Sequence, residues 1–108
     1  MSDVNITLNE RGTRYGSFAG HSRISQNFKR VAINTPNWHH LTDVHKEAFE
    51  MLFHKMARSL NGDENYIDTY RDIIGYTQLV INELMATDGA TDSKVVKMVV
   101  KEGLLTEV

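Results

Sequence analysis

Two pairs of acidic residues stand at helical spacing in the middle of the chain. Glu47 and Glu50 are three residues apart, and Asp68 and Asp72 follow an Asn-Gly-Asp turn and are four residues apart. Residues at these spacings share one side of a helix, so two antiparallel helices could bring four carboxylates together. Mg²⁺ binds such oxygens together with substrate phosphates. A solvated acidic surface has the same spacing, so both interpretations stay open.

Basic and aromatic residues near these acids could hold the phosphates of a ligand. Lys55 projects from the apolar side of its helix, where it either extends to the rim or pairs with an anion or carboxylate. Arg58 and Arg14 could add positive charge for phosphates. Arg14 precedes a glycine-punctuated loop in which Tyr15 could stack on a base, or could plug the end of the helices instead.

Two large side chains interrupt the polar stripe of the helix that carries Asp68 and Asp72. Tyr76 and Leu79 lie within or beside this stripe, where a purely solvated face would not need them. They either contact a second copy of the chain or line a ligand pocket, which makes Tyr76 a candidate ligand-binding residue. Gly75, in the middle of the same helix, indicates close helix approach or room for a ligand.

Composition excludes several classes of protein. The chain has 108 residues, 41% of them hydrophobic and 24% charged, which is typical of one soluble domain. A net charge of −2 gives no basic field for non-specific binding of nucleic acid. Without cysteine there is no disulfide, thiolate nucleophile or cysteine zinc site, and the histidine spacing matches no zinc pattern. No apolar run approaches the roughly 20 residues of a membrane span, so we expect a cytoplasmic protein without a membrane partner.

Apolar periodicity predicts an all-α protein, a small four-helix bundle. Ser22 is the expected cap of the first helix, and Thr42 or Asp43 that of the second. Val4 lies in an irregular N-terminal arm in which a short strand is also compatible with the alternation of apolar residues. The four predicted helices span residues 23–34, 43–60, 66–85 and 91–103.

The chain is expected to form a single domain over residues 1–108. It divides into an arm and loop at 1–21, a three-helix core at 22–86 and the C-terminal helix at 91–103. The helix predicted at 66–85 is apolar over more than half of its circumference, which is more apolar surface than one small core can bury. We therefore expect a homo-oligomer.

Three motifs together resemble a family of small phage and prophage proteins that has no assigned activity. The first reads Arg-Tyr-Gly-x-Phe-x-x-His and ends at His21, and the second reads His-Lys-x-x-Arg-x-Leu-Asn-Gly-Asp and ends at Asp63. The third, Asp-x-x-x-Asp-Ile-x-Gly-Tyr, ends at Tyr76. The resemblance covers roughly residues 10 to 86 and implies a protein acting in the host cytoplasm.

More distantly, the chain is similar to the all-α nucleoside triphosphate pyrophosphohydrolases of the MazG and dimeric dUTPase type. Those enzymes hold Mg²⁺ with Glu-x-x-Glu on one helix and Glu-x-x-Asp on another, and they cleave between the α- and β-phosphates. Glu47 and Glu50 match the first motif. In the second, Thr69 stands three residues before Asp72, and the acid is Asp68, four residues before.

This similarity implies a Mg²⁺-dependent pyrophosphohydrolase as the first of three functions. Its metal ligands would be Glu47, Glu50, Asp68 and Asp72, of which Glu50 and Asp72 would be catalytic. Nucleotide binding would fall to Arg14, Tyr15, Lys55, Arg58 and Tyr76. The substrate would be a nucleotide or another phosphate-bearing small molecule.

Two non-catalytic functions are alternatives to this hydrolase activity. The protein could sequester a host signalling nucleotide, which predicts tight binding without turnover. It could instead inhibit a host defence or replication protein by direct contact, which predicts an important exposed patch, for instance around Tyr76 and Leu79.

Overall fold

The structure, a computed structural model, describes residues 2–87 and 89–91. Over these ranges the chain is all-helical, with four α-helices, a short 3₁₀-helix and no strand. This confirms the predicted fold class. The elements are α1 (Ser2–Tyr15), α2 (Phe18–Ile33), η1 (Pro36–His40), α3 (Asp43–Asn61) and α4 (Ile67–Ala86).

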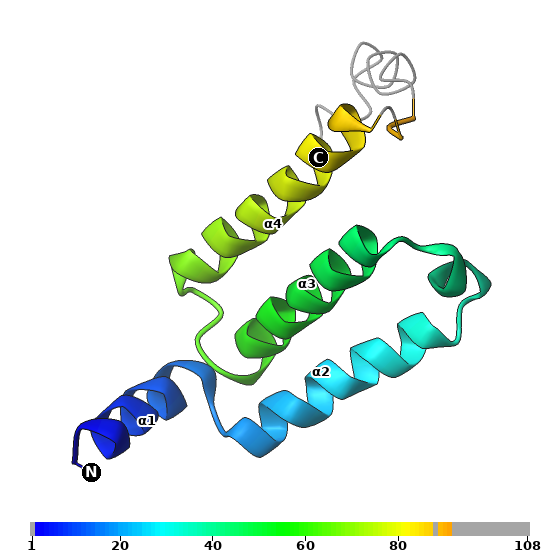
Figure 1. Cartoon of the computed structure of the whole chain (residues 1–108). Helices are drawn as coiled ribbons and strands as arrows, with labels where there is room; N and C mark the ends of the chain where they lie inside the picture. The colour runs from blue at the N-terminus through cyan, green and yellow to red at the C-terminus, as the bar shows by residue number, and fades with distance from the viewer. Residues whose placement is uncertain (1, 88, 92–108) are drawn as a thin grey trace, which may run out of the picture.

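Helices α2, α3 and α4 run antiparallel in chain order, with α3 in the middle (Figure 1). Helix α3 packs against both of its neighbours, whereas α1 contacts α2 and α3 at the end where α2 begins and α3 ends. We call the three antiparallel helices the α2–α3–α4 layer. Because α2 and α4 lie on opposite sides of α3, the layer leaves two broad faces.

Local signals set the limits of these helices. The Thr42 hydroxyl accepts a hydrogen bond from the backbone N–H of His45 and caps α3, while Gly62 ends it. Thr35, with φ −90° and ψ 143°, is extended before Pro36, as the steric effect of proline on its predecessor predicts. The helices predicted at 43–60 and 66–85 are therefore confirmed to within a residue.

Two sequence predictions about the N-terminal part are wrong. Residues expected to form an irregular arm form helix α1, because a helix satisfies its backbone N–H and C=O groups internally whereas a strand needs a partner. The cap of α2 is Ser17, not Ser22: its Oγ accepts a hydrogen bond from the N–H of Gly20 at 3.0 Å. The helix predicted at 91–103 lies outside the described residues except for position 91.

The core of the described chain is small. Its buried hydrophobic residues are Trp38, Ala48 and Ala57, and no large side chain is almost completely buried. Aromatic packing joins η1 to the layer: the Trp38 ring lies 6.5 Å from the Phe53 ring, between centroids. Phe53 in turn lies 5.8 Å from Phe28 of α2.

The α1–α2 link is held tightly against the end of α3. The Asn61 amide Nδ2 donates to the carbonyl oxygens of Tyr15 and Ser17, at 2.9 Å and 2.8 Å. Gly16 between them has φ +77°, and a Cβ there would overlap the carbonyl oxygen of Asn61. The N–H of Asp63 also donates to the carbonyl of Arg14 at 2.7 Å. These contacts fix the C-terminal end of α1 beside α3.

Within the described residues, none of the helices combines the length and the apolar character needed to span a membrane.

Candidate functional site

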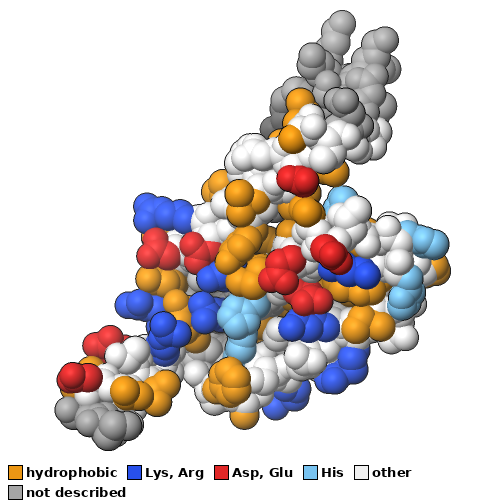
Figure 2. Space-filling model, viewed as in Figure 1, with side chains coloured by type: hydrophobic (Ala, Val, Ile, Leu, Met, Phe, Trp, Pro, Cys, Tyr) orange, Lys and Arg blue, Asp and Glu red, His pale blue; other side chains and the backbone are white. Residues whose placement is uncertain are grey.

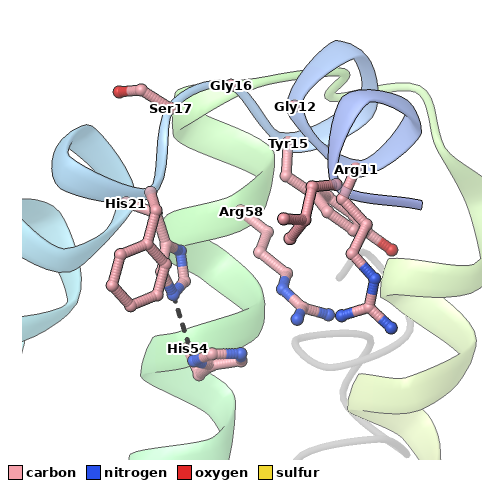
Figure 3. Close-up of a pocket in the computed structure, with 10 residues that line it drawn as sticks. Arg11, Gly12, Tyr15, Gly16, Ser17, His21, His54 and Arg58 are labelled. Atoms are coloured by element: carbon pink, nitrogen blue, oxygen red, sulfur yellow. Dashed lines mark hydrogen bonds between the residues drawn. The ribbon is translucent and has the colours of Figure 1, made fainter. Parts of the chain in front are cut away.

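A cavity lies where α1, α2 and α3 meet (Figure 3). It has a volume of about 460 Å³ and is lined mainly by apolar surface. We call it the junction cavity. Its lining residues are Leu8, Arg11, Gly12, Tyr15, Gly16, Ser17, Phe18, His21, His54 and Arg58.

A smaller, mainly polar hollow of about 260 Å³ adjoins it. This polar hollow shares Arg11, Tyr15 and Arg58 with the junction cavity and adds Arg14. Glu10 is the acidic residue in its lining. Three guanidinium groups against one carboxylate leave a surplus of positive charge in the lining of this hollow.

Two arginine–tyrosine stacks organise the polar hollow. The Arg58 guanidinium lies 4.4 Å from the ring centroid of Tyr15, and that of Arg14 lies 4.2 Å from Tyr66. Arg14 Nη1 also donates to the Tyr66 hydroxyl at 3.2 Å. The two tyrosine rings meet edge to face at 6.1 Å. The stacks hold both guanidinium groups in place without neutralising them.

The Tyr66 hydroxyl carries this network on to Asp68, donating to its Oδ2 at 3.0 Å. This hydrogen bond is the main reason why the pKa of Tyr66 is raised and that of Asp68 is lowered. Arg71 adds a 3.0 Å ion pair to Asp68. Asp68 is therefore an ionised carboxylate that is linked to Arg14 through one tyrosine.

Two histidines meet on the other side of the junction cavity. His21 Nε2 and His54 Nδ1 are 3.1 Å apart, and the rings are nearly perpendicular. Burial, followed by the positive charge of Arg58, lowers the pKa of His54 to about 4. The same two causes, in the same order, lower the pKa of His21. Both rings are neutral near pH 7, so the positive charge of the cavity resides on its arginines.

The structure brings three of the predicted ligand-binding residues together, namely Arg14, Tyr15 and Arg58. Lys55 is not among them. Its Nζ lies 2.8 Å from Asp72 Oδ2, and its side chain is 12% exposed against 48% for the aspartate. Of the two alternatives for Lys55, the structure has the carboxylate partner.

The four predicted metal ligands are spread along α3 and α4. Acidic and basic side chains gather over these helices on the face that Figure 2 shows. The ion pair with Lys55 places Asp72 level with Lys55 of α3. Glu50 lies five residues before Lys55, which is about 7.5 Å along the helix at 1.5 Å per residue. Glu47 lies three residues beyond that. Across residues 2–87 and 89–91, no three acidic or histidine side chains form a group that could hold a metal ion. Within one chain these acids therefore do not fit a shared Mg²⁺ site.

Tyr76 lines a separate shallow hollow of about 490 Å³ on α4. Arg71, Asp72, Gly75 and Leu79 complete its lining, and none of them borders the junction cavity. A Cβ on Gly75 would meet no atom within 4 Å, so close helix approach does not explain this glycine.

Sequence analysis did not assign Arg11 or the pairing of His21 with His54. Arg11 stands three residues before Arg14, a spacing that becomes informative only once the segment is known to be helical. The histidine pair depends on the register between α2 and α3, which neither helix encodes alone.

Comparison of the chain with protein-family models, with curated proteins and with solved structures finds no match.

The neutral state of His54 has a consequence for stability. The unfolded chain takes up a proton at the ordinary pKa of 6.5, whereas the folded chain does so at about 4. The free energy of unfolding should therefore fall as the pH falls from 6.5 towards 4. We expect a lower melting temperature at about pH 5 than at about pH 7.5. His54→Gln should reduce this difference, and His40→Gln on the exposed part of η1 should preserve it. Equal melting temperatures at the two pH values would contradict the lowered pKa of His54 in the folded protein.

Proposed function

We propose that this protein binds a nucleotide or another phosphate-bearing small molecule at the junction of α1, α2 and α3. The observation that carries the proposal is the position of Arg58. Its guanidinium borders both the junction cavity and the polar hollow and is stacked on Tyr15. One ligand with an apolar part and an anionic part would satisfy both spaces.

The two spaces match the two halves of a nucleotide. The apolar surface beside Leu8, Tyr15 and Phe18 suits a planar base, and Phe18, which is 82% exposed, is accessible to one. The arginines of the polar hollow suit phosphate oxygens, which guanidinium groups bind through paired hydrogen bonds. The volume of about 460 Å³ lies within the range of about 300–1,000 Å³ typical of small-molecule sites.

Magnesium would enter such a site with the nucleotide. Mg²⁺ commonly binds through one or two carboxylates together with substrate phosphates. Asp68 is the acid that the Arg14–Tyr66 network links to the polar hollow. Both Asp68 oxygens already accept hydrogen bonds, from Tyr66 and Arg71, and Asp68 lines neither space, so the phosphates would carry most of the metal coordination.

A Mg²⁺-dependent pyrophosphohydrolase is our second proposal, and it rests on the match of Glu47 and Glu50 to the Glu-x-x-Glu motif. It would need these two acids together with Asp68 and Asp72, which one chain does not bring together. Sequestration of a host signalling nucleotide, the function of an anti-defence protein of phage type, needs only the binding site. We therefore place binding before catalysis.

Isothermal calorimetry with adenosine triphosphate and pyrophosphate, with and without Mg²⁺, tests the proposal. Arg58→Gln should weaken binding at least about tenfold, because a hydrogen bond to a charged group contributes about 1.5–3 kcal/mol. Arg23→Gln is the matched control, since Arg23 is exposed on α2 and lines neither space. Equal affinity of the Arg58→Gln and wild-type proteins, or no binding by the wild type, would refute it. Pyrophosphate release from the triphosphate would support the hydrolase.

We also propose that a second copy of the chain covers one face of the α2–α3–α4 layer. Exposed apolar residues recur on α4 every seven positions, at Ile67, Ile74 and Ile81, which is the spacing of a helix–helix seam. Phe49 and Met56 repeat this spacing on α3.

These stripes share one face of the layer. On α4 the stripe lies roughly 130° around the helix from the half-buried positions Ile73, Tyr76 and Val80. On α3 it lies roughly 110°, in the same sense of rotation, from Lys55, which pairs with α4. In an antiparallel pair the two stripes then point to the same side. Three helices about 30 Å long and about 9 Å apart give a face on the order of 600 Å² in projection. That is close to the ~800 Å² of accessible surface that each partner buries in a standard interface. A twofold pairing of identical faces would supply the core that one chain lacks.

Light scattering at micromolar concentration tests this pairing, and we expect a dimer for the wild type. Ile74→Glu should dissociate it by placing a charge in the seam. Leu79→Glu is the matched control, because Leu79 is similarly exposed but lies about 140° away around the helix. A wild-type monomer, or loss of the dimer only in the Leu79→Glu variant, would contradict the proposed face.

A further inference from the structure

The hydrogen bond between the two histidines leaves one question of chemistry, namely which ring donates. A neutral imidazole has one N–H donor and one acceptor nitrogen. His21 Nε2 and His54 Nδ1 are 3.1 Å apart, so one of these two nitrogens carries a proton and the other does not. The choice decides whether the other ring nitrogen of His54, Nε2, is a hydrogen-bond donor or an acceptor.

The environment of His21 determines which of the two rings donates the hydrogen bond. The residue is only 6% exposed, and its Nδ1 is buried with no hydrogen-bond partner among the described residues. If His54 donated, the proton of His21 would sit on this Nδ1, and the orphaned N–H would cost about 1–3 kcal/mol. Orphaned buried N–H groups are rarer than acceptors left without a partner. The favoured arrangement therefore has His21 Nε2–H donating to His54 Nδ1.

The proton of His54 must then be on Nε2. In Figure 3 this edge of the His54 ring points away from His21, towards the side of the cavity that holds the Arg58 and Arg11 side chains. Guanidinium groups donate hydrogen bonds and accept none. The imidazole and both guanidinium groups thus offer only donors to a ligand.

We propose that His21 fixes His54 in its Nε2–H form, so that His54 and Arg58 make a donor-only edge for the ionised phosphate group nearest the apolar part of the ligand. Arg58 borders both spaces and His54 only the junction cavity, so this phosphate lies where the two spaces join. His21 acts as a positioning residue and does not touch the ligand. The ligand part of this inference rests on the proposed function, whereas the neutral Nε2–H tautomer of His54 is inferred from the structure alone. Inorganic pyrophosphate and a nucleotide share the phosphate chemistry and serve as separate probes.

Long-range ¹H–¹⁵N spectra of the full-length wild-type protein near pH 7 test the first part directly, because protonated and bare ring nitrogens resonate far apart. We expect Nε2–H for both histidines without any ligand. His21→Phe, which removes the donor, should release His54 into a mixture of the two neutral forms. A His54 ring protonated on Nδ1 in the wild type would overturn the inference.

Calorimetry with pyrophosphate and with adenosine triphosphate tests the second part. His54→Phe should weaken both ligands about tenfold or more, because it removes a hydrogen bond to a charged group. His54→Gln, whose amide can donate from a similar position, should stay within about threefold. Unchanged affinity in the His54→Phe variant of a protein that binds would overturn the donor-edge role. A wild type that binds neither probe would overturn the proposed function instead, and the spectra would still decide the form of His54.

Discussion

One side-chain amide determines the geometry of the candidate site. Asn61, the last residue of α3, donates from Nδ2 to the carbonyl oxygens on both sides of Gly16. The left-handed conformation of Gly16 permits this double contact, which fixes the direction in which α1 leaves the layer. Tyr15 is thereby brought under the Arg58 guanidinium. We call this double contact the Asn61 clamp. Because α1 makes few other contacts with the rest of the chain, we expect its position to depend largely on this clamp.

The Asn61 clamp helps to bring arginine and histidine side chains together around the junction cavity and the polar hollow. The two kinds of side chain have different roles. Arg11, Arg14 and Arg58 carry fixed positive charge, since guanidinium groups do not lose their protons in proteins. His21 and His54 are kept neutral by burial and by Arg58, so they add hydrogen bonding without adding charge. A site of this kind suits a ligand that is apolar at one end and rich in ionised oxygens at the other. The small core and the exposed apolar stripes of the layer are the basis of our proposal that two chains pair.

The sequence predicted the parts of this account that depend on local signals. Helical spacing, the Thr42 cap and the Gly62 stop were enough to define α3, because each acts within a few residues. The first helix was missed, since the alternation of apolar residues around Ile6 also fits a strand and only the absence of a partner strand decides against it. The acidic pairs were recognised, but their convergence depends on helix register. The ion pair between Lys55 and Asp72 shows which positions of α3 and α4 lie level, and in that register the acidic pairs are staggered.

The most direct test is a titration of the ¹⁵N-labelled protein with Mg²⁺–adenosine triphosphate, followed through backbone and arginine side-chain resonances. We expect the shifts to concentrate on Tyr15, His54 and Arg58, at the junction of α1, α2 and α3. The α4 hollow around Tyr76 serves as an internal reference and should not respond. Shifts centred on Arg71 and Tyr76 with none at Arg58 would contradict the account, as would a spectrum that does not change.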